Sequence, residues 1–214
     1  MIQFYMTPGS CSTGIHILLE EVGELFEVHI VNLLAGDQFK PEYLAINPKA
    51  SIPSLVRKDG IALTDFQSIA WWLARTYPRR ALLPDGLDAE LQVLERMNYA
   101  VNTLHGQGFA RIFTTEKFCA NPAEHQAIQA QGREIIDQGF ALVHQWLEGQ
   151  EYLVGNRYSI ADAALFYVEF WANYTQVPLP PNCQEHFKRL LERPPVRQVL
   201  TEEGYASILR SWRH

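Results

Sequence analysis

In the first eighty residues, the pattern of hydrophobic and polar positions alternates between segments typical of a strand and segments typical of a helix. Residues 2–6 form a short apolar run that predicts a strand, ended by the breaker Thr7-Pro8-Gly9-Ser10. From residue 12 to 23 the apolar side chains recur at i, i+3, i+4 and i+7, which predicts a helix stopped by its final glycine. Residues 28–33 are rich in β-branched side chains and predict a second strand, and residues 41–46 predict one short helical turn.

A hairpin signal follows. Residues 54–57 and 61–64 flank Asp59-Gly60, a dipeptide typical of tight hairpin turns, so these two strands should be antiparallel. The first two strands are joined by a helix and should be parallel. A further helix is predicted over residues 66–76. The order β-α-β, short helix, β-β-α is the layout of a thioredoxin-like domain, which we place at residues 1–79.

The remainder of the chain predicts helices only. Residues 80–88 contain Pro84, Asp85 and Gly86 and indicate a linker. Helical periods then cover residues 89–113, 123–147, 160–174 and 183–192. The predicted fold class is therefore α/β plus all-α, with a thioredoxin-like domain followed by an all-helical domain over residues 89–214.

Composition excludes several classes of protein. The 214 residues are 47% hydrophobic and 20% charged, which is ordinary for a globular chain. The net charge of −6 without a basic cluster argues against nucleic acid, and no apolar run is long enough to span a membrane. The start has no leader pattern, so we expect a soluble, cytoplasmic protein.

Cysteine and histidine spacing predicts neither disulfides nor a metal site. The three cysteines, Cys11, Cys119 and Cys183, are widely separated and form no Cys-x-x-Cys pair, which fits a reducing compartment. The seven histidines include no His-x-x-x-His pair. We therefore expect no bound metal.

The segment from Tyr5 through Cys11 is the first candidate for chemistry. Its loop leaves a strand and enters a helix, so backbone N–H groups and the positive end of the helix dipole should face Cys11 and lower its thiol pKa. No second cysteine follows within the loop, so Cys11 has no local resolving partner. The alternative is a small buried cysteine packed under a loop.

Two further patches could bind a ligand. If the Ile52-Pro53 bond is cis, Ile52 turns its N–H and C=O outward, where they could pair with an extended peptide; an ordinary trans turn is the alternative. At the start of the next helix, Asp65 either caps the helix or pairs with a ligand ammonium, while the helix start binds a ligand carboxylate.

Together, these patches resemble the glutathione transferase family, nearest its bacterial beta class. The resemblance rests on Phe4-Tyr5…Pro8-Gly9-Ser10-Cys11-Ser12, Asn47-Pro48-Lys49…Pro53-Ser54-Leu55, Leu63-Thr64-Asp65…Ile69, Asn98-Tyr99…Leu104-His105, Tyr158-Ser159-Ile160-Ala161-Asp162 and Arg193-Pro194-Pro195-Val196. The Ser159…Asp162 pair also matches a helix capping box. The match covers nearly the whole chain.

The resemblance implies a set of site residues. It implies that Cys11 contacts the sulfur of glutathione, the co-substrate, with Ser10 as a rival and Tyr5 nearby. The cysteinyl backbone of glutathione would contact Ile52 and Pro53. The ends of the peptide would contact Asp65, Phe66 and Lys49. From the helical domain, which would carry the electrophile pocket, Asn98 and His105 would reach the site; from spacing alone, His105 is an ordinary helix histidine.

Three functions remain open at this stage. The first is a transferase that conjugates the glutathione thiolate to small electrophiles, a detoxification reaction. The second is a glutathione-dependent thiol-disulfide or peroxide reductase that uses Cys11. The third is a non-catalytic interaction protein with the same fold. The family also implies a homodimer.

Overall fold

The computed structural model describes residues 1–212, which fall into two compact units. One unit comprises residues 1–82 together with 191–212, and the other comprises residues 83–190. The domain bounds expected from the sequence stay a prediction, but residues 191–212 fold with the first unit. Among residues 1–212, no helix is long and apolar enough to cross a membrane.

A four-stranded mixed sheet forms the centre of the first unit. Its strands are β1 (Ile2–Met6), β2 (Phe26–Ile30), β3 (Ser54–Val56) and β4 (Ala62–Thr64), in the order β2-β1-β3-β4. β1 pairs with β2 in parallel and β3 with β4 antiparallel, as the sequence predicts, and β3 also pairs antiparallel with β1. β2 begins and ends earlier than predicted because it pairs residue for residue with the five-residue β1, from Ile2↔Phe26 to Met6↔Ile30.

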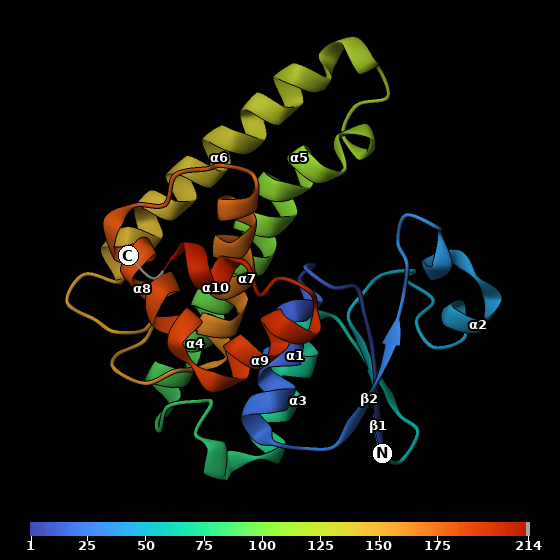
Figure 1. The fold of residues 1–214 in the computed structure, drawn as a ribbon, viewed down its shortest axis with the longest axis vertical. Coiled ribbons are helices and arrows are strands. Elements are labelled where there is room, and N and C mark those ends of the chain that lie inside the picture. Colours follow the sequence, from blue (N-terminus) through green and yellow to red (C-terminus); the bar gives the residue numbers. More distant parts are fainter. Residues whose placement is uncertain (213–214) are drawn as a thin grey trace. The chain divides into compact units, whose positions relative to one another are not determined.

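Helices cover this sheet. The first unit contains α1 (Ser12–Val22), α2 (Pro41–Leu44), α3 (Phe66–Thr76), α9 (Pro194–Glu202) and α10 (Ile208–Ser211), with short 3-10 turns at Asp37–Phe39 and Pro78–Arg80. α1 packs against both α3 and α9, and Figure 1 shows α9 lying beside α1. α1 ends at Gly23, whose φ of 69° is the left-handed geometry that glycine accepts readily.

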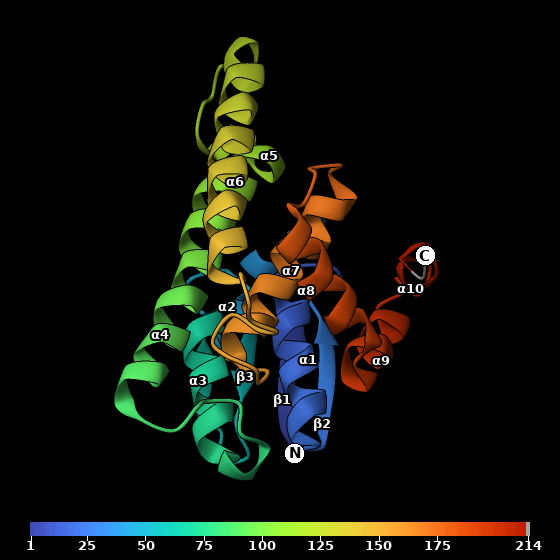
Figure 2. The same ribbon diagram turned by 90° about the vertical axis from the view of Figure 1, so that its left-hand side faces the viewer.

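The second unit is helical throughout its described elements. It contains α4 (Leu87–Asn98), the π-helical stretch η3 (Tyr99–Phe109), α5 (Ala110–Phe113), 3-10 turns at Thr115–Lys117 and Pro122–Glu124, α6 (His125–Trp146), α7 (Ile160–Tyr174) and α8 (Pro181–Glu192). α4, η3 and α5 form one long run with α6 alongside (Figure 2). The close approach needs glycine, since a Cβ on Gly108 would lie 2.6 Å from Ile136 Cγ1.

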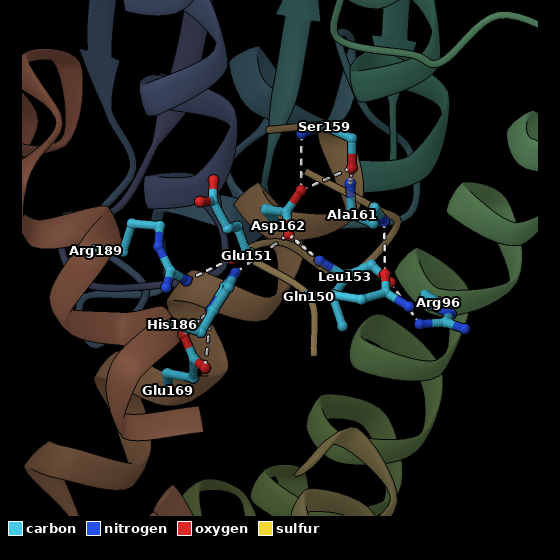
Figure 3. Close-up of polar contacts among 11 residues, drawn as sticks. Arg96, Gln150, Glu151, Leu153, Ser159, Ala161, Asp162, Glu169, His186 and Arg189 are labelled. Carbon is cyan, nitrogen blue, oxygen red and sulfur yellow. Dashed lines mark hydrogen bonds and ion pairs between the residues drawn. The ribbon is translucent and has the colours of Figure 1, made fainter. Parts of the chain in front are cut away.

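A buried ionic network holds the start of α7. The capping box predicted from the sequence is present, with the Ser159 N–H donating to Asp162 Oδ2 at 2.7 Å. His186 of α8 lies 3.1 Å from Asp162 Oδ1 and 2.9 Å from Glu169 Oε2, and all three are fully buried (Figure 3). Because both ring nitrogens face carboxylates, His186 donates from both and carries a positive charge.

Candidate functional site

The loop before α1 is closed by its own hydroxyl groups. Ser10 Oγ lies 2.6 Å from the Thr7 carbonyl oxygen and 2.5 Å from Ser12 Oγ, which in turn lies 3.0 Å from the same carbonyl. Ser12 Oγ also accepts from the Thr7 N–H. Each hydroxyl has one hydrogen to donate. Whichever serine donates to the other, both hydrogens are used inside the loop.

Cys11 occupies the N-cap position of α1 and is 7% exposed. Burial raises the pKa of its thiol to about 12, although the backbone N–H groups of Cys11 and Ser12 act in the opposite direction. The lowered pKa predicted from the sequence is therefore wrong for this structure: the helix terminus acts as expected, but loss of solvation outweighs it. The thiol is protonated, and Cys11 Sγ lies 3.6 Å from the Ile52 carbonyl oxygen as a donor.

The segment carrying Ile52 is held by polar side chains from α2 and the turn after it. The Ile52-Pro53 peptide bond is cis. Just before it, the Ser51 carbonyl accepts from the Tyr43 hydroxyl at 2.6 Å and from Asn47 Nδ2 at 2.7 Å. The sequence reasoning missed Tyr43, whose position in a short apolar helical turn gives no sign of this contact.

Asp65 is the N-cap residue of α3, and its backbone has an unusual conformation. Its φ of 71° is positive, and its side chain makes no capping hydrogen bond to the helix. The simple capping role that the sequence left open is therefore absent. The exposed carboxylate instead pairs with Lys49 Nζ, and it lies close enough to Cys11 to raise the thiol pKa. Phe66, the first residue of the helix, is buried.

Tyr5 lies on β1, and its hydroxyl group is hydrogen-bonded to a side chain of the same strand. The hydroxyl donates to Gln3 Oε1 at 3.3 Å, and the ring stacks on His29 with centroids 4.6 Å apart. Burial raises the pKa of the Tyr5 hydroxyl, with a further contribution from the charge of Glu27. The structure thus brings Cys11, Ile52 and Asp65 together, while the Tyr5 hydroxyl is engaged with Gln3.

A carboxylate from the C-terminal segment anchors the same loop. Glu203 Oε2 accepts from the Gly9 N–H at 2.8 Å and from Thr13 Oγ1 at 2.7 Å, while Oε1 lies 2.8 Å from His16 Nδ1. Tyr205 packs so tightly over Gly9 that a Cβ there would lie 2.3 Å from the Tyr205 hydroxyl oxygen. Sequence reasoning missed both residues because nothing local to them points to the loop.

In the second unit, His105 is set in a cluster of aromatic rings. Its Nδ1 lies 3.2 Å from the Tyr167 hydroxyl, and its ring meets that of Trp171 edge to face at 4.8 Å. Burial lowers the pKa of His105 to about 4, so the imidazole is neutral at physiological pH. Phe109 and Phe113 extend the cluster. Asn98 is exposed at the end of α4.

Comparison with known proteins decides the family. The family description "Glutathione S-transferase, N-terminal domain" matches residues 9–76, and "Glutathione S-transferase, C-terminal domain" matches residues 104–194. The chain is 32% identical to glutathione S-transferase GstA of Escherichia coli O157:H7, over 95% of this chain and 99% of the relative. The chain belongs to the glutathione S-transferase family.

Solved structures of other glutathione S-transferases share the fold. A homologue from Sulfitobacter with bound glutathione aligns with a TM-score of 0.87 at 26% identity, covering 96% of this chain and 99% of that one. The bacterial transferase BphK, solved as a ternary complex, aligns at 0.84 and 30% identity over 94% and 99% of the two chains. The beta-class enzyme of Sphingomonas chungbukensis aligns at 0.81 and 26% identity over 95% and 99%.

Proposed function

We propose that this chain is a glutathione S-transferase that conjugates the thiolate of glutathione to small electrophiles. The observation that carries the proposal is the convergence of three separate sequence patches: Cys11 Sγ lies 3.6 Å from the Ile52 carbonyl, and Asp65 is near enough to affect the Cys11 thiol. A thiol donor, peptide backbone groups and a charged pair at a helix start together suit a small peptide thiol.

Each end of glutathione finds a complementary group. Glutathione carries two carboxylates and one ammonium group. Asp65 supplies the negative charge for the ammonium, the N-terminus of α3 at Phe66 suits the neighbouring carboxylate, and Lys49 offers a cation. The backbone of Ile52, next to Pro53, pairs with the cysteinyl unit of the peptide.

Cys11 acts in this proposal as a neutral hydrogen-bond donor. A thiolate at Cys11 would oppose ionisation of a nearby glutathione thiol, because two like charges repel. A pKa of about 12 removes that conflict, since the Cys11 thiol stays protonated. When glutathione binds, the single hydrogen of the thiol turns from the Ile52 carbonyl oxygen, 3.6 Å away, to the glutathione sulfur. Glutathione then loses its thiol proton to solvent, and its sulfur attacks the electrophilic carbon while the leaving group departs with the bonding electron pair. Ser10 is the weaker rival, because its hydroxyl oxygen lies 2.6 Å and 2.5 Å from two loop oxygens, whereas the Cys11 thiol has only the 3.6 Å contact to the Ile52 carbonyl to give up.

The reductase alternative is less well supported. Disulfide exchange requires a thiolate at Cys11, and burial opposes its formation.

The electrophile would meet the aromatic cluster of the helical unit, where Phe113 is 44% exposed, with His105 as a neutral polar group and Asn98 nearby in sequence.

Assembly and location belong to the same proposal. We infer a cytoplasmic homodimer, supported by the family and by two exposed leucines on α4, Leu87 at 69% and Leu91 at 51%. Light scattering at micromolar protein should give twice the chain mass. A monomer mass would reject the dimer and leave the chemistry untouched.

Asp65→Asn tests the binding mode. Removing the carboxylate charge while keeping the shape should weaken glutathione binding by about 10- to 100-fold, since a charge-assisted hydrogen bond contributes about 1.5–3 kcal/mol. Titration calorimetry measures this directly. Asp59→Asn is the matched control, because Asp59 is also an exposed, ion-paired aspartate of the same unit. Equal affinity in Asp65→Asn and wild type would reject the proposed contact.

A further inference from the structure

A histidine and two carboxylates converge where α1 meets α9, away from the sulfur site. His16 and Glu20 lie one turn apart on α1, and Glu202 is the last residue of α9. One ligand atom from each of the three lies within 4.8 Å of the others. We call these three residues the α1–α9 cluster. Within residues 1–212, this is the one set of three or more His, Cys, Asp or Glu side chains whose possible metal-ligand atoms lie this close together.

His16 is the residue that points to a ligand. It is 3% exposed, and its Nε2 atom makes no hydrogen bond, although Glu202 Oε2 lies 3.3 Å away. The other ring nitrogen, Nδ1, lies 2.8 Å from Glu203 Oε1 and donates to it. Nδ1 therefore carries a proton, and Nε2, which makes no hydrogen bond, is the nitrogen that faces the two carboxylates of the cluster and can offer a lone pair to a cation.

This arrangement differs from that of His186, which is also buried. Both nitrogens of His186 make hydrogen bonds to carboxylates, which fixes that ring as a structural cation. His16 has one nitrogen anchored and one left open, solvent-shielded and turned toward acidic oxygens. A carboxylate that orients a histidine through its far nitrogen is the usual companion of a metal-ligating imidazole.

We propose that the α1–α9 cluster binds a divalent first-row transition cation, with Zn²⁺ as its occupant. Imidazole nitrogen with two carboxylate oxygens is a ligand set that Zn²⁺ accepts, with water completing the shell. The two carboxylates balance the charge of the cation. Glu203 is the outer partner that holds the His16 ring.

The electrostatics of the cluster favour a cation. Glu20 and Glu202 bring carboxylate oxygens within 4.8 Å of one another, where their like charges repel. A divalent ion between them removes this repulsion. Gln198 Nε2 donates to Glu202 Oε1 at 3.0 Å and orients that carboxylate.

The site would have a structural consequence. It ties α9 to α1, and the adjacent Glu203 carboxylate holds Gly9 of the loop that carries Cys11 and Thr13 in the first turn of α1. A cation bound there would stabilise the C-terminal segment against the first unit without touching the sulfur site. The inference does not depend on the proposed transferase activity.

Calorimetric titration of ZnCl₂ into the full chain, first stripped with a chelator, tests the proposal. The variants are the double substitution Glu20→Gln with Glu202→Gln, and the control Glu192→Gln, an exposed glutamate of the same chain segment. We expect one site in the wild type, unchanged in the control and weakened at least tenfold in the double variant. Thermal melting gives a second measurement: Zn²⁺ should raise the unfolding midpoint of wild type and control but not of the double variant.

Two outcomes would overturn the proposal. Equal Zn²⁺ affinity in the wild type and the double variant would place the ion elsewhere, with the three thiols as the obvious location. No measurable binding to the wild type would leave His16 as an imidazolium held between Glu202 and Glu203. Neither outcome bears on glutathione binding, which is measured separately.

Discussion

At Cys11, two opposing effects act on the same sulfur atom. The backbone N–H groups of Cys11 and Ser12 favour the thiolate, as a helix N-terminus generally does. Burial favours the neutral thiol, and burial is the larger effect, so the pKa rises to about 12. At pH 7 the residue is therefore a hydrogen-bond donor rather than a nucleophile. The closed hydroxyl pattern of Ser10 and Ser12 leaves this thiol as the side-chain donor of the loop.

Substitution of Cys11 distinguishes a hydrogen-bond donor from a nucleophile at this position. Cys11→Ala removes the donor and should lower kcat/KM for conjugation by about 10- to 100-fold, the effect of losing one hydrogen bond to a charged atom, about 1.5–3 kcal/mol. Cys11→Ser keeps a donor and should retain most of the activity. Steady-state kinetics with an activated aryl chloride measure both variants. Equal, complete loss in both would instead indicate that the sulfur itself reacts.

At the scale of elements, side chains far apart in sequence hold the helix starts. α7 begins at a capping box that its own sequence encodes, but His186 of α8 supplies the positive charge that pairs with Asp162 and Glu169. Burial alone would lower the pKa of His186, but the charges and hydrogen bonds of Glu169 and Asp162 outweigh it and raise the pKa to about 9. The start of α7 thus depends on a protonated histidine.

This dependence predicts how stability changes with pH. A histidine whose folded pKa lies above its unfolded value of about 6.5 stabilises fully below that value and loses its contribution as pH rises to about 9. The free energy of unfolding of the wild type should therefore fall, relative to His186→Asn, between pH 6.5 and 9. Urea denaturation across this range measures the difference. A constant difference would show that His186 does not titrate there.

At the scale of the whole molecule, local signals predict most elements and the β1–β2 and β3–β4 pairings, but not the side-chain contacts between distant segments. The helix over residues 66–76 and the strand over residues 2–6 have the bounds expected from periodicity and breakers. The observed β2 lies earlier than its local pattern predicts because its ends depend on its partner strand. α9 begins at Pro194-Pro195, a pair whose local sequence signals only a family motif. The π-helical η3 interrupts a run predicted as one helix.

The candidate site likewise contains features that the sequence predicts and features that only the folded structure shows. The motifs around Cys11, Ile52 and Asp65 are local, so the sequence could nominate all three. The protonation of Cys11 depends on burial by the rest of the fold, which no spacing reveals. The contacts of Glu203 with Gly9, Thr13 and His16 join the two ends of the chain, so only the folded structure discloses them.

The pKa of glutathione bound to the protein tests the central claim most directly. Thiolate absorbance in the ultraviolet, recorded against pH on the complex, reports the ionisation of the bound thiol. If the protein is a transferase that stabilises the glutathione thiolate through Cys11, this pKa should lie at least one unit below the ordinary thiol value of about 8.5, and Cys11→Ala should return it toward that value. An unshifted pKa in the wild-type complex would contradict the account.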